Sequence, residues 1–123
     1  MNQRVKKLWV DALRSGEYRQ DQWVLRRRIQ SDRPVCCAMG VLCEIAVNAG
    51  VVERHCPEDR SVVEYGRDRE SKVLPDEVID WAGLTGEEVF LEIEDDTYAS
   101  ISNLNDNCQW SFEQIATKIE EQL

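Results

Sequence analysis

The segment between Cys36 and Ala49 constrains the fold more than any other part of this chain. Eleven of its 14 residues are Ala, Val, Ile, Leu, Met or Cys, and Gly50 follows where a helix is expected to end. So apolar a segment must be covered on nearly every side, which predicts a buried central helix. Its one charged residue, Glu44, precedes Asn48 by four positions, so both are expected on a narrow face that reaches solvent or a polar partner.

Helical patterns at both ends of the chain predict two further helices that flank this centre. Near the start, Val5, Trp9 and Leu13 recur at helical spacing. Near the end, Ser111 and Gln114 have the spacing of a capping box ahead of an apolar stripe. A shorter helix is predicted over 74–83, where a proline and two acids occupy the first turn.

Short stretches with strand-like patterns lie between these helices. They cover residues 23–29, 51–52, 62–65 and 89–94. In the first stretch, Trp23, Leu25 and Ile29 are expected to share one apolar face, but Arg27 breaks the alternation. Either Arg27 lies at an edge, or the segment is a loop with its side chains free. Asp96 or Thr97 is expected to cap a further helical turn. Together these elements predict a small α+β fold with terminal helices around a buried central helix and a few short strands, in a single domain over residues 1–123.

Charge divides the chain just before Cys36. Residues 1–35 hold 9 Lys and Arg against 4 Asp and Glu, whereas residues 36–123 hold 6 against 20, and the formal net charge is −9. Such a distribution indicates binding through charge. Long duplex DNA is an unfavourable partner for a chain with this net charge.

The cysteines and the hydropathy pattern favour a cytoplasmic protein. The five cysteines are an odd number, and three of them, Cys36, Cys37 and Cys43, lie in the apolar segment, where a reduced cysteine acts as a small hydrophobe. The longest apolar stretch, 35–49, is shorter than the roughly 20 residues of a membrane-spanning helix. No signal-peptide pattern is seen at the start of the chain. We therefore expect no membrane partner.

Residues for catalysis or metal binding are sparse. His55 is the single histidine, and nothing near it resembles a catalytic elbow. His55 and Cys56 form the most ligand-like pair, but no pair of cysteines or histidines has the spacing of a zinc knuckle. We therefore predict no catalytic residue, metal or cofactor and favour binding over catalysis, while zinc at His55 and Cys56 remains an alternative to a solvent-exposed loop.

Four segments over most of the chain carry a resemblance. They are WVDALRSGEYRQ (9–20), VCCAMGVLCE (35–44), LPDEVIDWAGL (74–84) and LNDNCQWSFEQIATKIE (104–120). In this order they resemble an uncharacterised family of small proteins encoded by bacteriophages and some bacteria. The resemblance implies a protein that acts in the cytoplasm of an infected bacterium, and it implies no catalytic residue.

The first functional hypothesis assigns binding to the acidic part of the chain. A phage-encoded, non-catalytic protein would present carboxylates to a basic surface of a host protein, including a defence protein, and so modulate it. The alternative for these acids is a solubilising face. The candidate contacts are Glu87, Glu88, Glu92, Glu94, Asp95 and Asp96.

The second hypothesis assigns binding or sequestration of a small nucleotide to the arginine-rich N-terminal segment. Arginine pairs with phosphate, and aromatic rings stack on bases. Alternatively, these arginines pair with acids of the same domain or of a second subunit in a homodimer, and the Asn-Asp pair satisfies backbone groups in turns and caps. The candidate residues are Tyr18, Arg19, Trp23, Arg26, Arg27, Arg28, Arg33, Asn105 and Asp106.

Overall fold

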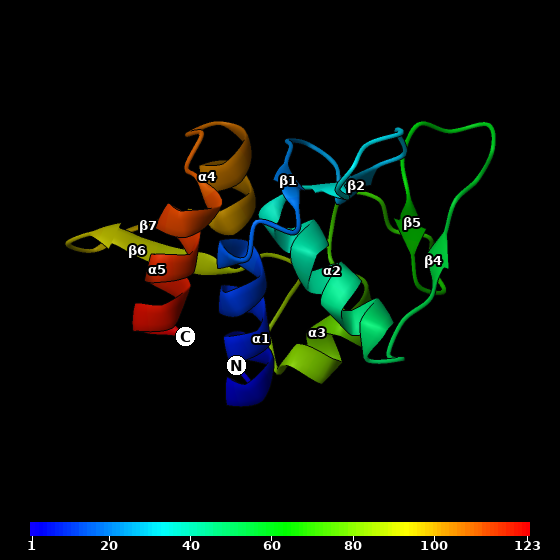
Figure 1. Ribbon diagram of the computed structural model, residues 1–123. Coiled ribbons are helices and arrows are strands. Elements are labelled where there is room, and N and C mark those ends of the chain that lie inside the picture. The colour runs from blue at the N-terminus through cyan, green and yellow to red at the C-terminus, as the bar shows by residue number, and fades with distance from the viewer.

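Three helices form the centre of the computed structural model, which describes residues 1–123 (Figure 1). Helices α1 (Gln3–Arg14) and α5 (Phe112–Gln122) lie side by side, and α2 (Ala38–Asn48) packs against α1. Nine of the eleven residues of α2 are buried, which confirms the predicted central helix. None of the helices is long and apolar enough to cross a membrane.

The shorter elements surround this centre. Helix α3 (Asp76–Ala82) packs against α2, as does α4 (Ile101–Asp106). Strands β1 (Arg19–Gln20), β2 (Arg26–Arg27) and β3 (Val35–Cys36) form a mixed sheet in the order β1-β3-β2. Two antiparallel pairs complete the fold, β4 (Arg54–His55) with β5 (Glu64–Tyr65) and β6 (Phe90–Glu94) with β7 (Thr97–Ser100). The α+β prediction is confirmed.

Close contacts place α2 against its neighbours. The fully buried Trp9 donates its indole N–H to the Ala38 carbonyl at 3.0 Å, which connects α1 to the first turn of α2. A Cβ atom at Gly40 would lie 1.6 Å from the backbone oxygen of Leu25. Only glycine therefore fits where the chain after Trp23 crosses α2.

The stretch 23–29 differs from the predicted strand. Only Arg26–Arg27 is a strand, Val24 and Leu25 are both buried, and Trp23 and Ile29 are both exposed. Trp23 has a φ of 76°, so the chain turns there and the alternation of faces is lost. The prediction of one shared apolar face was wrong for this reason.

The strand predicted directly after α2 was also misplaced. The Val51 N–H donates to the Ala46 carbonyl at 2.9 Å, so this residue takes part in the C-terminal cap of α2. The strand begins later, at Arg54.

The helical turn predicted after Asp96 begins later as well. Residues 97–100 form β7, and Ser100 is the N-cap of α4, with its hydroxyl accepting the Asn103 N–H at 3.1 Å. Asp96 instead occupies the hairpin turn with a φ of 56°, a conformation that Asp tolerates better than most residues. At the last helix the prediction was right, because Ser111 and Gln114 form the capping box of α5.

Candidate functional site

The β6–β7 hairpin carries four of the six predicted acidic contacts and projects beyond α5 on one side of the molecule (Figure 1). Leu91 and Ala99 are strand partners on its inner face, where Leu91 is fully buried and Ala99 packs against the core. At the tip, Glu94, Asp95 and Asp96 are exposed. The inner face therefore anchors the hairpin, and the tip presents carboxylates to solvent.

The side chain of Gln122 on helix α5 makes two hydrogen bonds to this hairpin. Oε1 of Gln122 accepts the Glu92 N–H at 2.8 Å, and Nε2 of Gln122 donates to the Glu92 carbonyl at 2.7 Å. The Glu92 carboxylate in turn accepts the Asp96 N–H at 3.0 Å. The amide of Gln122 thus occupies the place of a neighbouring strand, and the hairpin keeps a defined position on the body of the protein.

The outer face of the hairpin combines aromatic and acidic side chains. Phe90 and Tyr98 are 61% and 60% exposed. Glu92 is the cross-strand partner of Tyr98, and Phe90 lies two positions before Glu92, so all three share one face. Sequence reasoning named only the acids. The alternation in 89–94 contained the signal for Phe90, whereas Tyr98 lay in a segment that was not expected to be a strand.

Two predicted contacts, Glu87 and Glu88, lie before the hairpin and differ from each other. Glu87 is exposed, whereas Oε2 of Glu88 is buried and has no hydrogen-bond partner. Burial raises the pKa of Glu88 above the usual range of a glutamate. Glu88 therefore adds less to the exposed acidic surface than its neighbour.

Arg26, one of the predicted ligand contacts, belongs to a buried ionic cluster around Glu44. Glu44 is 4% exposed and accepts hydrogen bonds from Arg26 at 2.7 Å, from Arg54 at 2.6 and 3.0 Å and from the hydroxyl of Tyr65 at 2.5 Å. The hydrogen bonds to Glu44 raise the pKa of Arg54. The polar partner expected for Glu44 is thus this pair of arginines and one tyrosine.

The other arginines of the N-terminal segment are spread over different contacts. Arg27 pairs with Asp21 at 2.6 Å. Burial alone would raise the pKa of Asp21, but hydrogen bonds from Arg27 and from the backbone lower it below the usual value of an aspartate. Arg28 and Arg33 donate to backbone carbonyls, and the side chain of Arg19 is exposed and makes no hydrogen bond. The structure does not gather these arginines at one place. Arg26 and Arg27 pair with acids of the same domain, as the alternative expects, whereas Arg19, Arg28 and Arg33 do not.

Asn105 and Asp106 hold the loop that carries Trp23. Asn105 is fully buried, accepts the Ala38 N–H at 3.2 Å and donates to the Asp21 carbonyl at 2.8 Å. Asp106 accepts the Trp23 N–H at 3.0 Å. Both side chains thus satisfy backbone groups, while the Trp23 side chain is 59% exposed.

Tyr18, the remaining predicted contact, is half-buried and packs against the core. Burial, together with the negative charge of Glu44, raises its pKa. Its ring is therefore mainly a packing element.

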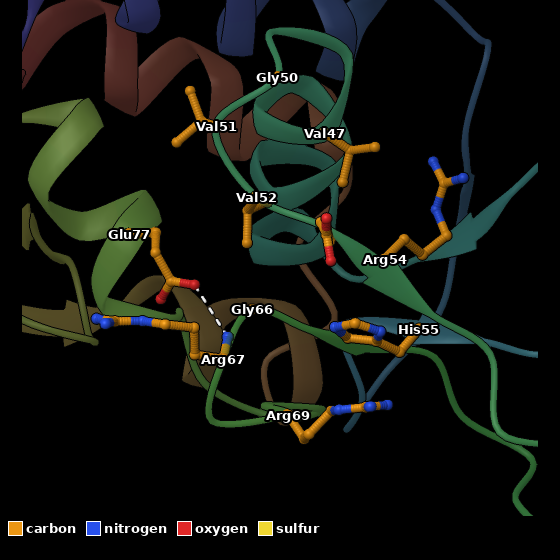
Figure 2. A pocket seen from close by; sticks show the side chains of 11 residues that line it. Val47, Gly50, Val51, Val52, Arg54, His55, Gly66, Arg67, Arg69 and Glu77 are labelled. Carbon is orange, nitrogen blue, oxygen red and sulfur yellow. Dashed lines mark hydrogen bonds between the residues drawn. The ribbon is translucent and has the colours of Figure 1, made fainter.

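A hollow that sequence reasoning missed lies at the C-terminal end of α2, whereas the loop that carries Trp23 lies at its N-terminal end. It has a volume of about 1010 Å³ and is lined by the end of α2, β4, the turn 66–69 and α3 (Figure 2). Val47, Val51 and Val52 form an apolar wall. His55, expected in a loop, lies on β4 at its rim. No pattern in the sequence links these segments, because only the tertiary fold brings them together.

The side chains that could ligate a metal are dispersed, and three of the five thiols are buried. No group of three or more His, Cys, Asp and Glu side chains comes together in a way that could hold a metal ion. Cys36, Cys37 and Cys43 are buried, and burial raises the pKa of Cys37 to about 12. These thiols stay protonated and serve as apolar core residues, while Cys56 and Cys108 are exposed.

Comparison with known proteins gives a family without a function. No curated protein and no solved structure matches this chain. A family model described as a domain of unknown function, DUF8296, matches residues 1–123. This match bears out an uncharacterised family and carries no information on a phage origin. Because the match covers the whole sequence, the chain belongs to the DUF8296 family.

Proposed function

We propose that this chain is a non-catalytic binding protein that docks on a basic surface of another protein through the β6–β7 hairpin. The observation that carries this proposal is the outer face of the hairpin, where Phe90 and Tyr98 are exposed on either side of Glu92. Exposed aromatic side chains that gather on one face, rather than singly, are typical of contact surfaces. Here they lie next to the acidic tip.

The chemistry of this face selects a partner rich in arginine or lysine. Carboxylates attract the cation, and an aromatic ring offers it a favourable face once it has arrived. Arginine fits better than lysine, because its planar guanidinium both stacks on a ring and pairs with a carboxylate. The net charge of −9 adds a long-range attraction that speeds the encounter with a basic partner.

The resemblance to small phage proteins extends this proposal to the identity of the partner. In that setting the basic surface belongs to a bacterial host protein in the cytoplasm, and binding modulates that protein. A nucleic-acid-binding protein suits this role, because carboxylates on the hairpin would occupy positions that phosphates otherwise take.

A short arginine-rich peptide tests the aromatic part of the proposal. Backbone amide shifts in the NMR spectrum should change most at residues 90–98 when the peptide is added. Replacing Phe90 and Tyr98 by serine should weaken binding about tenfold, or about 1.4 kcal/mol. The matched control is Ile29→Ser, because Ile29 is similarly exposed at 52% but lies elsewhere. Unchanged affinity in the double variant would refute the proposal.

One observation favours the small-nucleotide alternative. Trp23 is presented in a strained backbone conformation, and Arg19, four positions earlier, is exposed and unpaired. Together they offer a stacking surface and a phosphate donor. Quenching of tryptophan fluorescence by a mononucleotide, lost in Trp23→Phe, would support this function, and equal quenching in both proteins would exclude Trp23 as its site.

A further inference from the structure

We propose that the hollow beside the end of α2 binds a small organic anion that carries more than one phosphate or carboxylate group. The hollow is distinct from the hairpin, and the proposal is independent of the docking function. It begins with three donors, Arg67, Arg69 and the only histidine, which line the hollow together with Glu53 and Glu77, while the third lining arginine, Arg54, is paired with Glu44.

Arg67, Arg69 and His55 are donors with no strong partner. The side chains of Arg67 and His55 make no hydrogen bond within the protein. Arg69 makes only a long ion pair, 3.8 Å, with Oε1 of Glu64, while Oε2 of Glu64 accepts a 2.5 Å hydrogen bond from Arg60. Most arginines elsewhere in the chain donate to a carboxylate or a carbonyl. These three side chains therefore keep their hydrogen-bonding capacity for a ligand.

The turn that carries both arginines is held in a strained form. Tyr65 and Glu70 exchange backbone hydrogen bonds of 2.8 and 3.0 Å across it. Within the turn, Arg69 has a φ of 55°, an unfavourable conformation for a residue with a side chain. Strain of this kind persists where the surrounding structure enforces it, and it is frequent at ligand sites.

The donors lie at two separate parts of the hollow. Figure 2 shows Arg67 extending towards α3 and Glu77, whereas Arg69 lies below His55 on the side of β4. The contact between Arg69 and Glu64 agrees with this placement, because Glu64 is the strand partner of His55. Because the two arginines extend in different directions, we assign the hollow a ligand with at least two anionic groups, one for each part.

The remaining lining defines the middle of the ligand. The carboxylate of Glu77 already accepts the backbone N–H of Arg67 at 3.0 Å, which is the dashed line in Figure 2. Backbone hydrogen bonds also lower the pKa of Glu77. Arg54 is likewise engaged, with Glu44. Val47, Val51 and Val52 are the apolar residues of the lining, and Figure 2 shows Val52 pointing towards Gly66 while Val47 and Val51 lie to either side of it. An organic body between the anionic groups fits this wall better than a bare ion.

Calorimetric titration with inorganic tripolyphosphate and with citrate tests the site, and the two probes separate phosphate from carboxylate ligands. We expect one-site binding that is at least tenfold weaker in the double variant R67Q/R69Q. The matched control is R4Q/K72Q, because Arg4 and Lys72 are exposed, lack hydrogen bonds and lie outside the hollow. Inorganic phosphate, with one anionic group, should bind more weakly than either probe.

Four outcomes decide the proposal. Tighter binding of tripolyphosphate assigns the site to phosphates, and tighter binding of citrate assigns it to carboxylates, provided that R67Q/R69Q alone loses affinity. Absence of saturable binding for both probes overturns the proposal, as does an equal loss in the two double variants. Thermal unfolding of each variant verifies that the fold is intact.

Discussion

Glu44 and the acids of the β6–β7 hairpin are the same kind of group in opposite surroundings. Glu44 is buried, and each of its carboxylate oxygens accepts hydrogen bonds from Arg26, Arg54 or Tyr65. Glu94 and Asp95 are exposed, and their carboxylates make no hydrogen bond or ion pair within the protein. The buried carboxylate of Glu44 therefore connects elements of the fold, whereas the carboxylates of the hairpin tip are free to bind a partner.

The two regions also differ in the cost of removing a charge. A buried carboxylate between two arginines leaves unpaired cations behind when it is lost. An exposed carboxylate leaves only water-filled surface, and its contribution to stability is small. Stability and binding measurements on matched variants should therefore separate the two regions.

The largest effect on stability is expected for Glu44→Gln. This change removes the anion that Arg26 and Arg54 share, and the free energy of unfolding should fall by about 3 kcal/mol. Urea denaturation measures the loss. The exposed Glu58→Gln is the control, and a loss below about 0.5 kcal/mol in Glu44→Gln would remove the distinction between the two regions.

A second large effect is expected for Asn105→Ala. The substitution leaves the Ala38 N–H and the Asp21 carbonyl without their side-chain partner in a buried site, which should cost about 2 kcal/mol. Chemical denaturation provides the value. The exposed Asn107→Ala, two residues later, should cost much less, and equal losses would show that the burial of Asn105 is unimportant.

Glu88 is intermediate in burial between Glu44 and the acids of the hairpin tip. Its replacement should change stability by a smaller amount, and should raise it. Because burial raises its pKa in the folded protein, its contribution to stability is greatest below about pH 4.5 and is lost as the pH rises through the folded pKa. Glu88→Gln should therefore raise the melting temperature at pH 7, and this gain should vanish in acid. A gain that is independent of pH would contradict the assignment to its charge.

The smallest effect on stability is expected at the hairpin tip. The double variant E94K/D95K should change the free energy of unfolding by less than about 0.5 kcal/mol, because both side chains are exposed and make no hydrogen bond. Thermal unfolding tests this expectation. A large loss would mean that the tip has a structural role and would weaken its assignment to a partner.

Local patterns predicted the helices well and the contacts between elements poorly. Helix α2 follows from its run of apolar residues, and α5 from the capping box of Ser111 and Gln114, because both signals lie within the element itself. Strands of two residues, such as β2 and β4, depend on hydrogen bonds from distant segments. Sequence periodicity carries little information about them.

The same limit applies to the candidate sites. The exposed acids around residue 94 were predictable from their run in the sequence, and Phe90 followed from alternation with buried neighbours. The pairing of Arg26 with Glu44 was open in advance, since either charge had many possible partners. The hollow was not predictable at all, because α2, β4 and the turn at Arg67 meet only in three dimensions.

Binding of a short arginine-rich peptide to two charge-reversal variants tests the central claim most directly. E94K/D95K and E58K/D59K change the net charge equally, and both pairs are exposed. The account predicts that the Kd rises at least tenfold for E94K/D95K and by about twofold or less for E58K/D59K. Equal increases in the two variants would show that the peptide responds to overall charge, and would contradict a docking site on the hairpin.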